Sequence, residues 1–517
     1  MNTRESDASR FRKLQKQLPK VWQRYQEDPC YEHTSVIVPS MSVNQEELAK
    51  VTGAAFYEER LMFALIRLRN PNARLIYVTS QPVHPDIVDY YLQLLDSVSA
   101  SHARRRLHMV SVFDSSARPL SEKILERPNL LKRLKKFIGD RDHAYLTCYN
   151  STVLERRIAL ELDIPMNGLD PDLLTLGTKS GNRKIFAEAG INYPCGFEDL
   201  HSEDDVVQAL IALRKQRPGL ARAVVKLNEG FGGEGNAVFS YPPESAGEDG
   251  VREALRNLAW LSGIETYEKF MTKFDKMGGI VEELVVAAET RSPSVQMRIL
   301  PDGGARIVSS HEQVLGGSTG QSYLGCRFPA DDDYRGVLLA EAAKVGAALG
   351  KQGVIGRYAI DFLATRSSGQ STWDVHAIEI NLRMGGTTPP YHALEFLTEG
   401  ALDEDSGLFL APDGKAKYYK ATDNFKSPAY RGLLPEDLFE IIWNRGIGFK
   451  HSTGTGVLFY MIGALSQYGK VGMTCIGNSP EEAQHLFDET ARIMDDSTTG
   501  EDHGVAAPMN DRYIGME

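Results

Sequence analysis

The sequence predicts a multidomain protein of α/β and α+β class, and three observations support this prediction. The chain has 517 residues, more than one ordinary domain contains. Its first third alternates apolar runs with helical patterns, which is typical of βαβ units. From about residue 176, strand-like runs follow one another through glycine-containing turns, which indicates an antiparallel α+β region. We expect three segments, 1–175, 176–402 and 403–517.

The first segment is expected to be a doubly wound α/β domain. Its strand-like runs end in small polar residues, and helical patterns such as QEELAKVTGAAFYEERLMFALIRLR lie between them, so the strands should pair mostly in parallel. The four expected strands are SVIVPS, RLIYVTS, LHMVSVFD and AYLTCYN.

The two later segments have different patterns of helices and strands. The middle segment starts with a basic helix, KSGNRKIFAEAGI, and the last one returns to an α/β pattern before a tail that we expect to be flexible. The expected strands of the middle segment are GGIVEELVVA, SPSVQMRILP, GARIVSSHEQVL, GRYAIDFLAT and DVHAIEINL.

Composition argues against several classes of partner and location. The net charge of −11 gives no general attraction to nucleic acid or to an anionic membrane. The 5 cysteines form no C-x-x-C pair, which favours reduced thiols over disulfides or a zinc site. The sequence shows no signal-peptide core and no run of transmembrane length. We therefore expect a cytoplasmic protein.

A glycine-rich loop, EGFGGEG, predicts a phosphate contact. It satisfies G-x-G-x-x-G, but the strand-like NAVFSYPP follows it, whereas a dinucleotide fingerprint needs a helix there. A hairpin of this kind can lay backbone N–H groups, here those of Gly232 and Gly233, over nucleotide phosphates. Lys226 stands on the strand before it. The alternative is a glycine-rich surface hairpin with a solvated lysine.

A second pattern, HAIEINLRMGG, predicts a magnesium site. Glu379, Asn381 and Arg383 alternate with apolar residues and so share one face of a strand, while Asp361 lies within RYAIDFLA. Carboxylate and amide oxygens are ligands that Mg²⁺ prefers. Two acids on neighbouring strands repel unless a cation lies between them. Arg383 is expected to neutralise a transferring phosphoryl group. The alternative is a row of solvent-facing polar residues.

The stretch IVEELVVAAET suits a nucleoside. Leu284 and Val285 would supply an apolar slot for a base, and Glu282 and Glu289 are the carboxylates available for the ribose hydroxyls. The alternative is a strand end that is rich in acidic residues and binds no ligand.

The order of these features resembles that of ATP-grasp ligases. Lys179 before a helix, Lys226 before the hairpin, the Glu282–Glu289 stretch, Asp361 and EINLR occur in that order. Within that class, the chain from about residue 35 to 490 is similar to the peptide ligase family of pheganomycin biosynthesis. The stretches that carry this resemblance are VIVPS, YEER, LIYVTSQPV, FDSSARPLSEKIL, LGTKSGNRKIFAEAGI, EQVLGGSTGQSYLGCRFPA and NLRMGGTT.

The resemblance implies a Rossmann-like pre-ATP-grasp domain, an ATP-grasp core and a C-terminal domain, with a homodimer as the expected assembly. It also implies the site roles. Lys179 and Lys226 are expected to contact the phosphates of ATP. Adenine is expected at the backbone of Glu283, Leu284 and Val285 beside Glu282, and the ribose at Glu289. Two Mg²⁺ ions are expected at Asp361, Glu379 and Asn381, and the transferred phosphoryl group at Arg383. One departure is visible: relatives usually read GGTTHP, whereas Pro389 and Pro390 follow the threonines here.

We therefore expect an ATP-dependent carboxylate–amine ligase that forms a peptide bond through an acyl phosphate and releases ADP and phosphate. His311 and Arg327 are weaker candidates for gripping the carboxylate or deprotonating the amine. The substrates would be a small carboxylate and an amino acid or peptide amine. The alternatives are a carboxylate–thiol ligase that loads a carrier protein, a nucleotide-binding module without turnover, and a structural protein.

Overall fold

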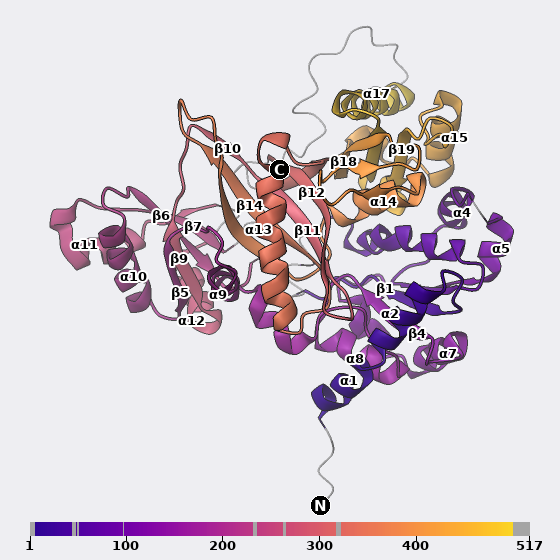
Figure 1. Cartoon of the computed structure of the whole chain (residues 1–517), viewed down its shortest axis with the longest axis horizontal. Coiled ribbons are helices and arrows are strands. Elements are labelled where there is room, and N and C mark those ends of the chain that lie inside the picture. The colour runs from indigo at the N-terminus through magenta and orange to yellow at the C-terminus, as the bar shows by residue number, and fades with distance from the viewer. Residues whose placement is uncertain are drawn as a thin grey trace, which may run out of the picture.

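The computed structural model contains three β-sheets with helices around them (Figure 1). It describes residues 6–43, 48, 51–96, 98–230, 235–261, 265–316 and 322–499. The mixed α/β and antiparallel architecture agrees with the fold class predicted from the sequence.

The first sheet is parallel, with strand order β3-β2-β1-β4, and it contains all four strands predicted for the N-terminal segment. Its strands are β1 Thr34–Val38, β2 Arg74–Thr79, β3 Leu107–Ser111 and β4 Ala144–Cys148. The helices around it are α1 Asp7–Gln15, α2 Leu18–Glu27, η1 Ala54–Arg69, α4 Pro85–Gln93, α5 Ala100–Arg105, α6 Leu120–Leu125, α7 Pro128–Ile138 and α8 Val153–Leu162.

The YEER motif lies in η1, which is a 3₁₀ helix where an ordinary helical pattern was expected. Its charged residues are buried, and both glutamates accept hydrogen bonds. Glu58 accepts hydrogen bonds from the Ser80 backbone N–H (2.5 Å) and hydroxyl (2.7 Å). Glu59 accepts one from the backbone N–H of Gly463, in the C-terminal segment, at 3.1 Å. The motif therefore connects the N-terminal segment to the C-terminal segment.

A small antiparallel sheet, with order β5-β9-β6-β7-β8, follows. The glycine-rich loop joins two paired strands, β6 and β7, as the sequence predicts. The strands are β5 Gly196–Leu200, β6 Arg222–Leu227, β7 Asn236–Ser240, β8 Ala259–Trp260 and β9 Gly279–Glu283. The accompanying helices are η2 Pro171–Gly177, α9 Lys179–Ala189, α10 Glu203–Gln216, η3 Glu244–Ala246, α11 Gly247–Leu255 and α12 Tyr267–Met277.

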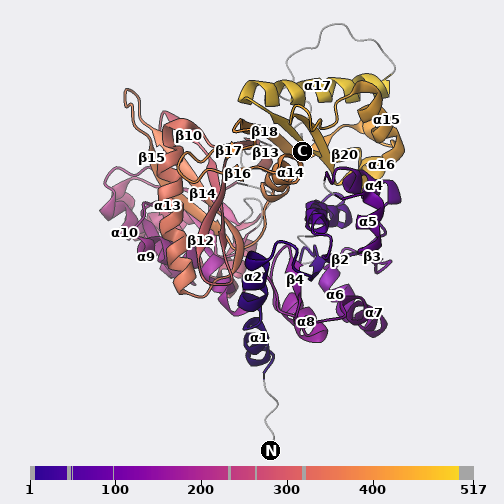
Figure 2. The same cartoon turned by 45° about the vertical axis from the view of Figure 1, so that its right-hand side comes forward.

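The large sheet has eleven strands and runs from β10 through β14, β11, β12, β13 and β18 to β17 and β16, with β15 beside β14. A long helix, α13 (Asp332–Lys351), packs on β11 and β12 (Figures 1 and 2). The strands of its first part are β10 Glu289–Arg291, β11 Pro293–Ile299, β12 Ala305–Gly316, β13 Ser322–Phe328, β14 Gly356–Arg366 and β15 Asp374–Asn381. They include the remaining strands predicted for the middle segment.

The C-terminal segment continues this sheet, because β18 pairs with β13. At this seam a Cβ on Gly325 would lie 2.3 Å from the carbonyl oxygen of Ala421, so the close approach requires glycine. The predicted boundary at residue 402 thus falls within one continuous sheet. The remaining elements are α14 Thr388–Thr398, β16 Ala401–Leu402, β17 Phe409–Leu410, β18 Ala416–Lys426, η4 Pro428–Tyr430, α15 Pro435–Arg445, β19 Gly456–Tyr460, η5 Ile462–Ala464, α16 Leu465–Tyr468, β20 Lys470–Gly477 and α17 Pro480–Thr499.

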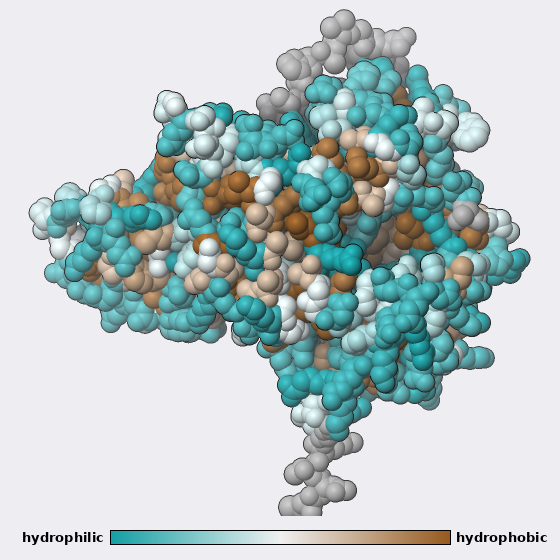
Figure 3. Space-filling view, viewed as in Figure 1, coloured by the Kyte–Doolittle hydropathy of each residue, from teal (hydrophilic) through white to brown (hydrophobic). Residues whose placement is uncertain are grey.

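One hydrophobic core joins the N-terminal and C-terminal segments. It contains Leu65 and Tyr77 from the first segment, Leu394 from α14, and Phe459 and Met473 from the last strands. Helix surfaces are mostly polar, and apolar side chains come to the surface in a band over the large sheet (Figure 3). None of the helices within the described residues combines the length and hydropathy of a membrane span.

Adjacent positions on α13 test this packing. Leu338 is completely buried in the core beneath the helix, whereas Val337 is 49% exposed. We expect Leu338→Ala to lower the free energy of unfolding by about 2–5 kcal/mol, because it leaves a cavity. The matched Val337→Ala should cost less than about 1 kcal/mol. Equal losses in denaturant-induced unfolding would contradict the packing described for α13.

Candidate functional site

A cleft of about 490 Å³ lies between the small and the large sheet. Most of the residues predicted to bind nucleotide or metal line it. They are Lys179, Lys226, Glu282, Glu283, Leu284, Val285, Asp361, Glu379, Asn381 and Arg383.

The acids predicted to hold metal are adjacent in the large sheet. Asp361 of β14 pairs directly with Glu379 of β15, so both carboxylates lie on the cleft face. Burial is the largest cause that raises the pKa of Asp361, to about 7, and the charge of the Glu379 carboxylate is the second. The amides of Gln313 and Asn381 donate to its two oxygens at 2.8 and 2.9 Å. This is a carboxylate pair that a divalent cation would stabilise.

The two lysines belong to the other wall, where Lys179 pairs with an acid of the large sheet and Lys226 pairs within the small sheet. Lys179, the first residue of α9, forms an ion pair with Glu379, and Lys226 of β6 lies 2.5 Å from Glu282. Burial alone would raise the pKa of Glu379, but Lys179 and then Arg383 hold it below its ordinary value. Thr178 caps α9 through a 3.0 Å bond from the Gly181 N–H, which fixes where Lys179 enters the cleft.

Asn381 links the acids to Arg383. The Arg383 Nη2 donates to Asn381 Oδ1 at 3.1 Å, so the amide oxygen that would ligate a metal already accepts a hydrogen bond. A carbonyl oxygen has two lone pairs, so one remains available for a metal. The donor set otherwise consists of hard oxygens, which suits Mg²⁺.

The expected adenine contacts lie where β9 ends. Glu282 is buried and pairs with Lys226, and its other oxygen lies 3.3 Å from Arg183 Nη1. The backbone N–H of Leu284 donates to the Arg222 carbonyl at 3.3 Å. The chain leaves the small sheet here and crosses to the large one, so Leu284 and Val285 lie at the junction of the two walls.

Glu289 does not line the cleft. Its carboxylate accepts two 2.8 Å hydrogen bonds from Arg366 Nη2, and this arginine lowers its pKa. A ribose contact from Glu289 would require this pair to open. The sequence could not show it, because Arg366 follows 77 residues later, on a strand whose register is fixed only by pairing.

His311 and Arg327 also lie outside the cleft, and this geometry gives no support to their expected roles. His311 is completely buried, its Nε2 lies 2.5 Å from the Tyr419 hydroxyl, and burial lowers its pKa to about 3. Arg327 is exposed on β13. Gly232 and Gly233 are outside the described residues.

The sequence did not predict a role for Gln313, which lines the cleft, or for Arg183, which contacts a cleft residue. Gln313 holds Asp361 in place, and Arg183 contacts Glu282. Gln313 is a polar residue in the alternating pattern SSHEQVL, which was the only available signal. Both contacts depend on pairing between distant strands or helices, so spacing along the chain could not predict them.

The two prolines that depart from the usual family pattern fit the local structure. Pro389 and Pro390 lie in the first turn of α14, where a missing N–H breaks no helical hydrogen bond. The Thr388 hydroxyl accepts from the Gly385 N–H at 3.0 Å, which secures the turn. His392 bonds Glu395 on the same helix.

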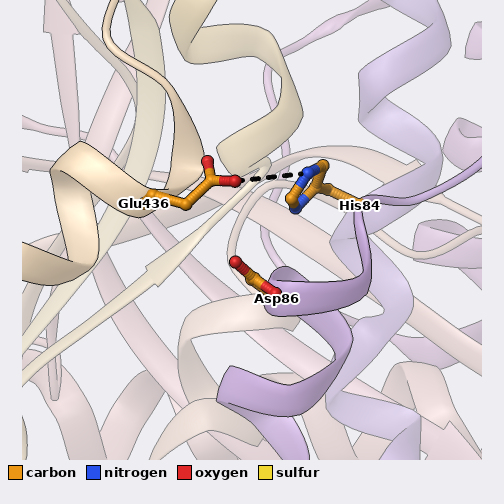
Figure 4. A group of neighbouring side chains, drawn as sticks. All are labelled: His84, Asp86 and Glu436. Carbon is orange, nitrogen blue, oxygen red and sulfur yellow. Dashed lines mark ion pairs between the residues drawn. The ribbon is translucent and has the colours of Figure 1, made fainter.

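A separate polar group lies at the surface between α4 and α15. His84 Nε2 and Glu436 Oε1 are 3.5 Å apart, with Asp86 beside them (Figure 4). Potential ligand atoms of all three lie within 4.8 Å of one another. His84 and Glu436 are exposed, so we interpret the group as an ion pair that joins the two helices.

Two antiparallel sheets that enclose lysines and paired acids form the arrangement expected of an ATP-grasp nucleotide site. Comparison with known families agrees: residues 173–241 and 255–405 match the family described as IQCH-like, ATP-grasp. Residues 437–490 match the PGM1 C-terminal domain. The middle of the chain is therefore similar to ATP-grasp proteins.

Two characterised relatives differ in how much of them the chain covers. The L-propargylglycine–L-glutamate ligase of Streptantibioticus cattleyicolor is 29% identical over 462 residues, which cover 87% of this chain and 92% of the relative. The IQ motif-containing protein H of Danio rerio is 24% identical over 516 residues, and the chain spans only 48% of its length.

Solved structures of biotin carboxylases share the fold. The domain from Hydrogenobacter thermophilus, in complex with MgADP, has a TM-score of 0.54 at 12% identity and covers 88% of both chains. The Campylobacter jejuni enzyme, in complex with a β-γ-ATP ligand, has a TM-score of 0.53 at 14% identity, covering 90% of this chain and 95% of that one. At these identities the likeness concerns the fold.

Replacing one acid of the pair should have opposite effects on the free and the bound protein. We expect Asp361→Asn to raise the melting temperature of the nucleotide-free protein, because it removes the repulsion from Glu379. The same change should weaken binding of MgATP by about tenfold or more. The control is Asp374→Asn, an exposed position on the neighbouring strand β15. Unchanged MgATP binding by calorimetry would show that Asp361 does not contact the metal.

Proposed function

We propose that this chain activates a carboxylate with ATP as an acyl phosphate and joins it to the amine of an amino acid or short peptide. The reaction class, amide-bond formation by an ATP-grasp ligase, is the one predicted from the sequence, and the likeness to an amino acid ligase over 87% of the chain confirms it. The observation that carries the proposal is the adjacent pair Asp361 and Glu379 facing Lys179 across the cleft.

The proposed reaction has two steps. An oxygen of the carboxylate attacks the γ-phosphorus of ATP, the bond to the β–γ bridging oxygen breaks, and ADP leaves. The amine then attacks the acyl carbon, phosphate departs with its bridging oxygen, and the amine loses a proton. Phosphoryl transfer depends mainly on positioning and charge neutralisation, which suits a cleft of lysines, arginine and acids.

The roles of single residues are part of the proposal. Lys179 and Lys226 would exchange their carboxylate partners for nucleotide phosphates. Asp361, Glu379 and Asn381 would hold two Mg²⁺ ions, which neutralise the phosphate charge. Arg383, next to Asn381, would stabilise the transferred phosphoryl group.

A second candidate is a nucleotide-binding module without turnover, because IQ motif-containing protein H carries no reaction in its name and the chain matches that family's ATP-grasp domain.

The deciding experiment is a screen of carboxylates and amines that measures ADP and phosphate release and identifies products by mass. A product that survives hydroxylamine is an amide, whereas a labile one indicates a carrier thioester. Binding of ATP with no ADP formed by any substrate pair would favour the module.

Glu379→Gln should reduce turnover by orders of magnitude while leaving the fold intact, because it removes charge from the metal site. Asp374→Asn, five positions earlier on the exposed part of β15, should retain activity and serves as the control. Turnover is measured as ADP release at saturating substrate. Full activity of the Glu379 variant would exclude the proposed metal site.

Lys226→Ala should raise KM for ATP by about tenfold or more, because it removes a buried charge from the phosphate wall. The matched control is Lys184→Ala, whose side chain is exposed and pairs with Asp199 outside the cleft. An unchanged KM for ATP in the Lys226 variant would require another position for the phosphates.

A further inference from the structure

A second cavity, of about 220 Å³, lies between the N-terminal domain and the large sheet. It shares no lining residue with the nucleotide cleft. One wall comes from α2, η1 and β4, and the other from β11, β14 and α14. Figure 2 shows α2 at this junction of the two halves.

Its walls combine aromatic rings with guanidinium groups. Arg298 lies 4.9 Å from the Trp22 ring centroid, and Arg67 lies 5.5 Å from that of Tyr145. Arg357 is the third arginine of the wall. The aromatic residues are Trp22, Tyr25, Tyr31, Phe63 and Tyr145.

The three arginines lack a matching set of acids. In the described part of the chain, no carboxylate lies within 4.0 Å of Arg67, Arg298 or Arg357, and the Arg357 Nη1 is buried without a hydrogen-bond partner. Glu395 is the acid of the cavity wall, and its Oε2 is already engaged by His392 Nδ1 at 2.5 Å. The wall therefore holds three guanidinium groups and one carboxylate.

This crowding is costly for the positive charges. Burial is the largest cause that lowers the pKa of Arg298, to about 10, and the neighbouring charges of Arg357 and Arg67 lower it further. Burial also lowers the pKa of Arg357. Buried like charges without counter-charge destabilise the folded protein, and a bound anion would relieve them.

We propose that this cavity binds the carboxylate of a small ligand with an aromatic or apolar body, about the size of one amino acid. Planar guanidinium groups bind carboxylates in bidentate geometry, and the rings would cover the rest of the ligand. The cavity has less than half the volume of the nucleotide cleft, which disfavours a nucleotide.

The cavity is linked to the proposed reaction site through the sheet and α14. Arg298 pairs with Arg357, and Ser294 pairs with Asp361 on the same two strands, so the arginines lie about 13 Å from the acid pair. Between them, Gln296 donates to the Thr387 carbonyl at 2.8 Å and closes the wall. The ligand could thus come from two sources, the carboxyl end of a substrate or a separate effector.

The test uses the full-length protein without nucleotide. We expect phenylacetate to raise the melting temperature in a concentration-dependent way, and the neutral phenylacetamide to have no such effect. Arg298→Gln and Arg357→Gln should each weaken phenylacetate binding at least tenfold in calorimetry, and Arg298→Lys should restore only part of it. Arg105→Gln, at an exposed position, is the control. The MgATP-induced melting shift should persist in every variant, which shows that each is folded.

Equal stabilisation by the acid and the amide, binding that is unchanged in both arginine variants, or no binding of phenylacetate at millimolar concentration would overturn the proposal. In turnover assays, competition between phenylacetate and the amine substrate would identify the cavity as a substrate pocket. A kcat that phenylacetate changes without competition would identify an effector site. Either result supports the proposed site. Because the binding test needs no catalysis, a protein that binds phenylacetate but releases no ADP refutes only the ligase proposal, and the converse result refutes only this one.

Discussion

The cleft depends on the placement of two carboxylates, those of Asp361 and Glu379, side by side in the large sheet. Strand pairing forces this proximity, since the two residues are directly opposite each other. Lys179 balances Glu379 from the far wall, and the amides of Gln313 and Asn381 hold Asp361. Two acids and two lysines are thereby kept in one cleft, where a metal-bound polyphosphate can satisfy both kinds of charge at once.

The rest of the fold serves to bring the two walls together. Lys179 and Lys226 come from the small sheet and α9, and the acids come from the large sheet. The chain crosses between them at Leu284 and Val285, so the site lies at the junction of the two sheets. Such a junction lets a nucleotide contact both sheets and stabilise one arrangement of them.

The N-terminal domain and the C-terminal strands share a core, and the contact of Glu59 with Gly463 joins them further. The second cavity lies where this combined unit meets the large sheet. Helix α14 reaches both places, because Thr388 secures the turn beside the cleft and Glu395 lines the cavity. The two sites therefore share one helix.

The sequence by itself determined the fold class, the four parallel strands, the pairing of the strands on either side of the glycine loop, and most of the nucleotide and metal candidates that line the cleft. These follow from periodicity and from order along the chain, which are local properties. Only the tertiary structure decided that Glu289 pairs with Arg366, that His311 is enclosed beside Tyr419, and that Arg67, Arg298 and Arg357 meet in one cavity. Each of these results depends on which distant strands and helices pack together, and that choice is set by packing of the whole core and not by spacing between neighbours in sequence.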